Sequence, residues 1–152
     1  ANPKEIAYFD RGPVDSTRLQ MAGSWSVYWY NGVMVSSEIA RGLDIFELTP
    51  SAFISQNEID AAKTVHMDFL NAQGQPKFVW PPSFALARAY VDQLERSKGL
   101  EAARISSIRD ALSGAEQASG SARQEALTKL ATELEGESAG AGDAAMVYPA
   151  WT

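Results

Sequence analysis

The sequence contains no cysteine, and this absence excludes several kinds of chemistry at once. Disulfide bonds, thiolate metal sites and cysteine nucleophiles all require that residue. The compartment stays open, because many periplasmic proteins also lack cysteine. Histidine is almost absent as well, with His66 alone, and no Gly-x-Ser-x-Gly elbow occurs. These shortages disfavour metal-dependent and serine hydrolases.

Positive charge and long apolar runs are also scarce. Lysine and arginine number 13 against 19 aspartates and glutamates, which gives a net charge of −6 and an isoelectric point near 4.8. Nucleic acids and anionic membranes bind basic surfaces, so the charge disfavours both as partners. No window approaches the roughly 18 consecutive apolar residues of a membrane span, so we expect no transmembrane segment. The 152 residues fit one domain, or a small domain with an appendage.

The stretch from Gly23 to Leu48 predicts three short antiparallel strands, over about 24–30, 33–39 and 43–48. Asn31-Gly32 suits a two-residue hairpin turn, because both residues tolerate positive φ. That turn predicts four facing pairs, namely Tyr30–Val33, Trp29–Met34, Tyr28–Val35 and Trp25–Glu38. Trp25, Val27 and Trp29 are expected on one face. Neither face is polar, so we expect a cover on both sides.

Shorter signals flank this stretch. Ile6 to Phe9 is a strand-like run after a proline, and residues 13–22 form a polar loop. Beyond the strands, Ser55 and Glu58 form a capping box that predicts a helix to about Leu70, with Ile59, Ala62, His66 and Phe69 on its apolar stripe.

Three further helices are predicted over 82–97, 101–113 and 122–135, the last with a capping box at Ser121. We expect them to meet through Val91, Leu94, Ile108, Leu112, Leu127 and Leu130. The fold class is therefore α+β: a small antiparallel sheet followed by three to four short helices. The expected organisation is a sheet (1–48), a connector with one helix (49–81), a helical region (82–135), and a linker with an apolar tail (136–152).

Several segments resemble the LVIVD-repeat proteins, a bacterial β-propeller family. Asn2 to Tyr8 looks like the strand that follows the family's repeat core, Gly23 to Gly32 like a terminal repeat, and Gly42 to Leu48 like its Gly-Leu-hydrophobic ending. Residues from Ser55 to about Leu134 are similar to a C-terminal extension of some members. The resemblance implies a propeller-blade-like sheet in an extracytoplasmic protein, and it brings no catalytic residues. A propeller needs several blades, whereas this sequence supplies little more than one.

Candidate functional residues are few. His66 could serve as a metal ligand or base with Asp60 or Asp68, but a histidine at the edge of a helix stripe is the favoured interpretation. Glu38 and Asp44 could form a carboxylate pair, although Glu38 more readily meets Arg41 or a donor from another strand. The aromatic cluster could stack on a sugar or quinone-like ring; packing between sheets is favoured. A partner interface is expected at Trp25, Tyr28, Trp29, Tyr30 and Trp151.

Three functional hypotheses follow. The first is a non-enzymatic binding or assembly module, the C-terminal blade and helical extension of an extracytoplasmic propeller, which needs no cofactor and contacts the remaining blades or another subunit. The second is an accessory subunit that docks by its hairpin and helices, including by strand addition. The third is one wall of a propeller enzyme's active site. Because the sequence opens at Ala1 without a signal peptide, we expect a mature form or part of a larger protein.

Overall fold

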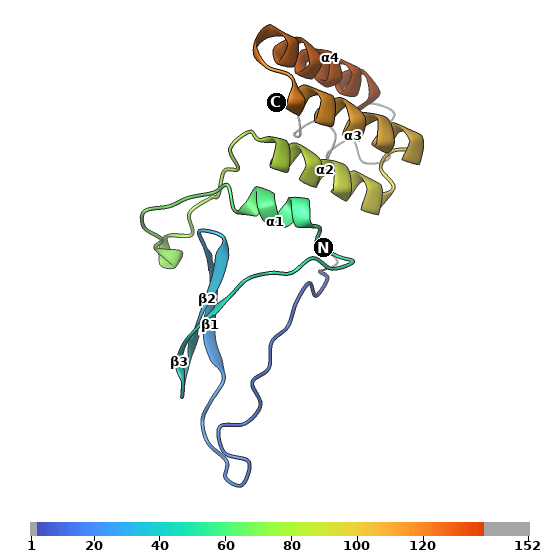
Figure 1. Ribbon diagram of the computed structural model, residues 1–152. Coiled ribbons are helices and arrows are strands. Elements are labelled where there is room, and N and C mark those ends of the chain that lie inside the picture. The colour runs from blue at the N-terminus through green and yellow to red at the C-terminus, as the bar shows by residue number, and fades with distance from the viewer. Residues whose placement is uncertain (1–2, 139–152) are drawn as a thin grey trace. The chain divides into compact units, whose positions relative to one another are not determined.

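The computed structural model describes residues 3–138 and shows an α+β fold (Figure 1). The chain divides into two compact units, Ala1–Trp80 and Pro81–Thr152. Within residues 3–138, the first carries a three-stranded antiparallel sheet and one α-helix, and the second carries three α-helices. The expected fold class is thereby confirmed. Across residues 3–138, no helix has both the length and the apolarity that crossing a membrane requires.

The sheet has the order β1-β2-β3, with β1 at Ser24–Tyr30, β2 at Val33–Glu38 and β3 at Gly42–Phe46. Asn31 and Gly32 form the turn between β1 and β2, with φ values of 47° and 92°. Positive φ at both positions is what a two-residue turn that follows the strand twist requires. The predicted turn is confirmed, as are the pairs Tyr30–Val33, Trp29–Met34 and Tyr28–Val35.

The predicted pairing of Trp25 with Glu38 is wrong. Ser24 pairs with Glu38 and Ser26 with Ser37, so the ladder is irregular at Trp25. An extra residue in one strand leaves its side chain outside the regular pairing, and Trp25 is 77% exposed. The sequence hides this irregularity, because Trp25 continues the alternation of Val27 and Trp29.

The register divides the strand side chains between two faces. One, the Phe46 face, carries Ser24, Val27, Trp29, Met34, Ser36, Glu38, Asp44 and Phe46. The other, the Tyr28 face, carries Ser26, Tyr28, Tyr30, Val33, Val35, Ser37, Leu43 and Ile45. A cavity of the first unit lies on the Phe46 face, and the Tyr28 face carries exposed apolar side chains.

The expected strand at Ile6 to Phe9 is absent, since residues 3–10 have no regular secondary structure. The segment crosses the Phe46 face instead of joining an edge. The Phe9 ring lies 4.7 Å from the Phe46 ring between centroids, and Arg11 pairs with Asp44 at 2.9 Å. The apolar residues of this segment therefore contact the sheet through their side chains and do not pair with a strand through the backbone.

Helix α1 (Gln56–Ala62) begins at the predicted capping box. Ser55 Oγ accepts from the Glu58 N–H at 3.2 Å, and a Glu58 carboxylate oxygen accepts from the Ser55 N–H at 2.7 Å. The helix ends at Ala62, far short of the expected Leu70. Backbone groups of Met67 bond the Asn31 side chain, which draws the following chain away from the helix path. A short 3₁₀ turn, η1, follows at Ala72–Gly74.

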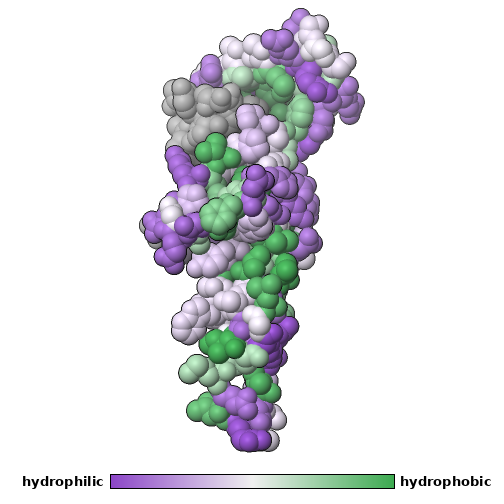
Figure 2. All heavy atoms as spheres, turned by 90° about the vertical axis from the view of Figure 1, so that its left-hand side faces the viewer, coloured by the Kyte–Doolittle hydropathy of each residue, from purple (hydrophilic) through white to green (hydrophobic). Residues whose placement is uncertain are grey.

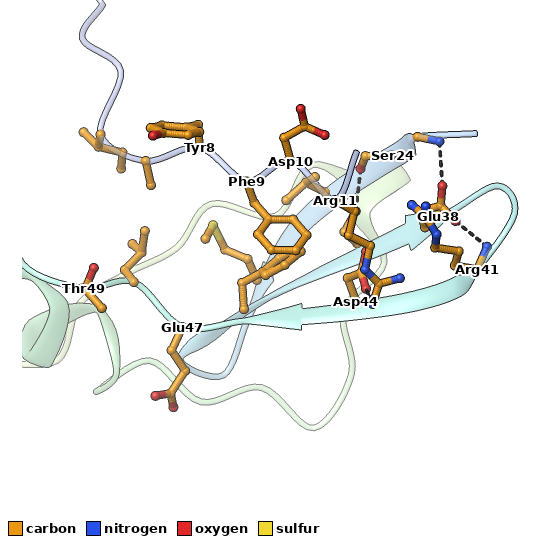
Figure 3. A pocket seen from close by; sticks show the side chains of 18 of the residues that line it. Tyr8, Phe9, Asp10, Arg11, Ser24, Glu38, Arg41, Asp44, Glu47 and Thr49 are labelled. Carbon is orange, nitrogen blue, oxygen red and sulfur yellow. Dashed lines mark hydrogen bonds and ion pairs between the residues drawn. The ribbon is translucent and has the colours of Figure 1, made fainter. Parts of the chain in front are cut away.

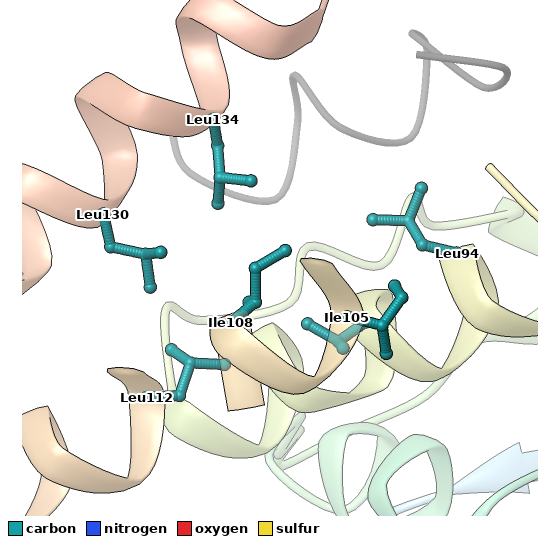
Figure 4. Close-up of a cluster of buried hydrophobic side chains, with 7 residues drawn as sticks. Leu94, Ile105, Ile108, Leu112, Leu130 and Leu134 are labelled. Atoms are coloured by element: carbon teal, nitrogen blue, oxygen red, sulfur yellow. The ribbon is translucent and has the colours of Figure 1, made fainter. Parts of the chain in front are cut away.

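The helical unit consists of α2 (Phe84–Ser97), α3 (Ala102–Gln117) and α4 (Gly120–Ser138). Helix α3 packs against both α2 and α4. The buried core is formed by Val91, Leu94, Ile105, Ile108, Leu112, Leu130 and Leu134, with Leu127 partly buried beside it (Figure 4). The predicted seam is confirmed, and the core extends one turn further through Ile105 and Leu134.

The ends of α2, α3 and α4 differ from prediction by up to four residues, and two of the differences lie at the turn between α3 and α4. Helix α3 continues through Gly114 to Gln117, four residues past its expected end at 113. Helix α4 begins at Gly120, so Ser121 lies in its first turn and is not the cap. A capping box in the sequence needs a helix that starts after the serine, and here the α3–α4 turn is too short to leave that space.

Candidate functional site

A cavity of about 470 Å³ opens on the Phe46 face, beneath the segment of residues 6–12 (Figure 3). Val27, Met34 and Phe46 of the strands contribute apolar surface to it, and Ile6 and Phe9 line it from the N-terminal segment. Binding pockets are commonly apolar with a few polar groups that orient the ligand. What this cavity could do chemically therefore depends on its polar residues, chiefly Glu38, Asp44, Arg11 and Arg41.

Glu38 is buried, at 7% exposure, and its carboxylate serves the backbone. One oxygen accepts from the Gly23 N–H at 2.6 Å, and the other accepts from the N–H groups of Ala40, at 3.0 Å, and Arg41. The hydrogen bond from Gly23 is the main reason that the pKa of Glu38 lies below its usual value, with those from Arg41 and Ala40 adding to it against the opposing effect of burial. This carboxylate caps the β2–β3 turn.

Asp44 is committed to a different partner. Its carboxylate pairs with the Arg11 guanidinium at 2.9 Å, and its side chain is only 10% exposed. Arg41 in turn donates to the Gly12 and Pro13 carbonyl oxygens at 3.3 and 3.0 Å. Both carboxylates are therefore engaged separately, and the expected meeting of Glu38 with Arg41 is confirmed, through the Arg41 backbone N–H. The polar groups hold the N-terminal segment over the sheet.

The Tyr28 face presents a different surface. Ile45 is 62% exposed, Leu43 60% and Tyr28 44%, while Val35 lies between them half-buried. The register sets Tyr28, Val35 and Ile45 side by side across the three strands. Apolar side chains gather at the surface over the sheet-bearing unit, as the green areas of Figure 2 show. A contiguous exposed apolar patch is typical of a protein-binding surface.

Charge is missing from the Tyr28 face. None of its eight strand residues is acidic or basic, and its hydroxyls include a Ser26–Ser37 pair at 2.9 Å. Burying an unpaired charge is the main obstacle to a dry interface. A partner that covers this surface would bury none. The face is suited to packing against another apolar surface.

The expected interface residues are divided among several environments. Trp25 is exposed at the irregularity, and Tyr28 belongs to the exposed face. Trp29 is half-buried on the opposite face. Tyr30 is half-buried and donates its hydroxyl to the Met67 carbonyl oxygen at 3.1 Å. Trp151 lies outside the described residues. The four aromatic side chains that the structure describes thus form no single cluster.

Leu43, Ile45 and Val35 were missed as interface candidates. The sequence shows Leu43 and Ile45 alternating along the third predicted strand, and the β2–β3 register of the structure places them on the same face as Tyr28. The aromatic residues were predicted as the interface instead, since tryptophan and tyrosine dominate binding energetics at many interfaces.

His66 is exposed and lies beyond the end of α1, so its expected place on a helix stripe is wrong. Phe69, the expected neighbour on that stripe, is 78% exposed. Among residues 3–138, no cluster of three or more histidine or acidic side chains is placed to bind a metal ion.

Comparison with protein-family models, curated proteins and solved structures finds no match for this chain.

Proposed function

We propose that the chain is a non-catalytic binding or assembly module, the C-terminal blade and helical extension of an extracytoplasmic bacterial β-propeller of the LVIVD-repeat type. The observation that carries the proposal is the Tyr28 face, a charge-free apolar sheet surface with Leu43 and Ile45 about three-fifths exposed. Propeller blades pack their sheets face to face, and each such contact requires an apolar face on both of the sheets that meet. The sequence resemblance supplies the family and the extracytoplasmic location.

The engagement of the carboxylates supports the non-catalytic part of the proposal. Glu38 accepts hydrogen bonds from Gly23, Ala40 and Arg41. Asp44 pairs with Arg11. A general acid or base has to reach a substrate proton, and both carboxylates are occupied in holding the chain together.

Hydrogen exchange tests the proposal in two samples. One is the native product, purified with any associated blades or subunits, and the other is the isolated chain. If other blades cover the Tyr28 face, packing should slow local opening of β3, so its amides should exchange more slowly in the native product than in the isolated chain. The amides of α3, buried within the helical unit, serve as the internal control and should exchange alike. Equal exchange of β3 in both samples would contradict docking by this face.

A second candidate, an accessory subunit that docks by strand addition, is supported by the sheet order. Within the described residues β1 and β3 are the outer strands, and each has one edge outside the ladder. An extended partner segment can add to such an edge through backbone hydrogen bonds. Polar substitutions at Leu43 and Ile45 distinguish the two candidates: they weaken docking by the face, whereas edge docking depends chiefly on the backbone.

A further inference from the structure

The turn residue Asn31 is held by the backbone of a segment far along the chain. Its Nδ2 donates to the Met67 carbonyl oxygen at 2.9 Å, and its Oδ1 accepts from the Met67 N–H at 2.8 Å. The Tyr30 hydroxyl donates to the same carbonyl oxygen at 3.1 Å. We name these three hydrogen bonds the Met67 latch.

Asn31 is followed by Gly32, and this neighbour makes the asparagine chemically labile. The Gly32 backbone nitrogen can attack the Asn31 side-chain carbonyl carbon, since glycine has no side chain to obstruct the approach. A new C–N bond closes a five-membered succinimide, the bond from Cγ to Nδ2 breaks, and ammonia leaves with the proton from the Gly32 nitrogen. Water then opens the ring to give aspartate or isoaspartate.

We propose that Asn31 is a deamidation site that the Met67 latch protects and whose conversion releases the latch. Ring closure has to turn the carboxamide toward Gly32, so both hydrogen bonds to Met67 must break first. Gly32 is itself buried beside Lys63, with the Lys63 Cγ 3.1 Å from the place that a Cβ would occupy. The reaction therefore requires local opening of the turn.

The product no longer fits the latch. An aspartate carboxylate still accepts from the Met67 N–H, but it has no donor for the Met67 carbonyl oxygen. Two oxygens would face each other where the Nδ2–H···O bond now lies, at a distance of 2.9 Å. The modification thus releases the segment at Met67 from the β1–β2 turn. This inference does not depend on the propeller proposal.

The first test measures deamidation of Asn31 by peptide mapping in the folded chain and in urea, with Asn57 and Asn71 as references. We expect Asn31 to react more slowly in the folded chain. The factor of slowing should match the hydrogen-exchange protection of the Met67 amide, because one local opening limits both processes. Equal rates in the folded and unfolded chains would overturn the protection.

A variant that weakens the latch without changing the Asn31-Gly32 dipeptide separates the latch from general folding. Tyr30→Phe removes one of the three latch hydrogen bonds, together with a longer one to the Asp68 carbonyl oxygen at 3.4 Å, so deamidation in the folded chain should accelerate while the rate in urea stays the same. Tyr28→Phe, an exposed tyrosine on the same strand, is the matched control and should change neither rate. Equal acceleration by both variants would contradict the role of the latch.

The release of the latch is tested with Asn31→Asp. At neutral pH the variant should unfold at lower urea concentration than the wild type. The deficit should shrink in acid, where a protonated carboxyl again offers a donor. The charged or titratable groups around the turn, namely Lys63, Glu47, His66, Asp68 and Tyr30, are present in both proteins, so the difference in stability reports the introduced carboxyl and its interactions with them. An absent deficit at neutral pH, or one that persists unchanged in acid, would refute the release.

Discussion

The Asn31 carboxamide and the Met67 backbone exchange two hydrogen bonds, of 2.9 and 2.8 Å, across 36 residues of chain. A primary amide has the donor and acceptor spacing of a peptide group, so this pair imitates one rung of a β-ladder. The turn that joins β1 to β2 is thereby fastened to the segment that follows α1. Gly32 completes the arrangement by leaving room for the Lys63 side chain.

Gly32→Val is predicted to destabilise the first unit by about 1–3 kcal/mol, the usual cost of a strained backbone position. A β-branched residue is disfavoured at the φ of 92°, and its Cβ would lie 3.1 Å from the Lys63 Cγ. Urea unfolding followed by tryptophan fluorescence measures the change, since Trp25 and Trp29 lie on β1.

The control is Gly114→Ala, at an exposed helical position where an added Cβ meets no atom within 4 Å. It should stabilise the helical unit by about 0.5–1 kcal/mol, because alanine favours helix over glycine. An unchanged urea unfolding midpoint for Gly32→Val would contradict the assignment of a turn with positive φ at Gly32.

Leu112→Ala and Leu130→Ala are each predicted to cost about 2–5 kcal/mol, since both leave a cavity in the helical core. Leu112 is 0% and Leu130 3% exposed. Circular dichroism during urea unfolding measures the loss. Thr128→Ala, at an exposed position of α4, is the control and should change stability by no more than about 0.5 kcal/mol. Stability untouched by both leucine variants would mean that α3 and α4 do not pack as described.

Acid should weaken the β2–β3 turn through Glu38. The hydrogen bond from Gly23, together with those from Arg41 and Ala40, lowers the pKa of this carboxyl in the folded chain. Its stabilising contribution is therefore complete above the unfolded-state pKa, about 4.3 for glutamate, and is lost as the pH falls through the lower folded-state pKa.

Glu38→Gln tests this contribution directly. The variant should be less stable than the wild type at neutral pH, because the amide replaces one acceptor oxygen with a donor that faces backbone N–H groups. The two proteins should converge below the folded-state pKa, where the wild-type carboxyl is also neutral. Parallel urea midpoints from neutral pH to acid would show that the ionised carboxylate contributes nothing.

The strands and the helical seam could be predicted from the sequence because their signals are local. Asn31-Gly32 requires positive φ at both positions, which determines the turn and then the register of its three nearest pairs. Large apolar residues recur at helical spacing along α3 (Ile105, Ile108, Leu112) and α4 (Leu127, Leu130, Leu134), so the buried seam follows from periodicity.

What the sequence could not predict depends on contacts between distant residues. Helix α1 ends at Ala62, before the segment in which Met67 bonds Asn31, and no glycine or proline near Ala62 marks that end. The segment at Phe9 has the composition of a strand but contacts Phe46 across a face of the sheet. Composition cannot distinguish these two uses of apolar residues.

The candidate site was predicted in part. An exposed Tyr28 follows from its place on β1, whereas Tyr30 is occupied by Met67 and Trp29 lies on the other face. Leu43 and Ile45, the most exposed members of the Tyr28 face, became candidates only when the β2–β3 register was combined with their exposure.

The central claim is that the Tyr28 face is a docking surface, and analytical ultracentrifugation of the isolated chain, combined with binding of a hydrophobic dye, tests it most directly. Each large apolar side chain left in water forgoes about 1.5–3 kcal/mol of burial, so we predict self-association or dye binding by the wild type. Leu43→Thr combined with Ile45→Thr should reduce both signals, since threonine retains strand propensity with less apolar surface. Leu19→Thr, at a fully exposed loop position off the sheet, should leave them unchanged. A stable, dye-silent wild-type monomer would contradict the account.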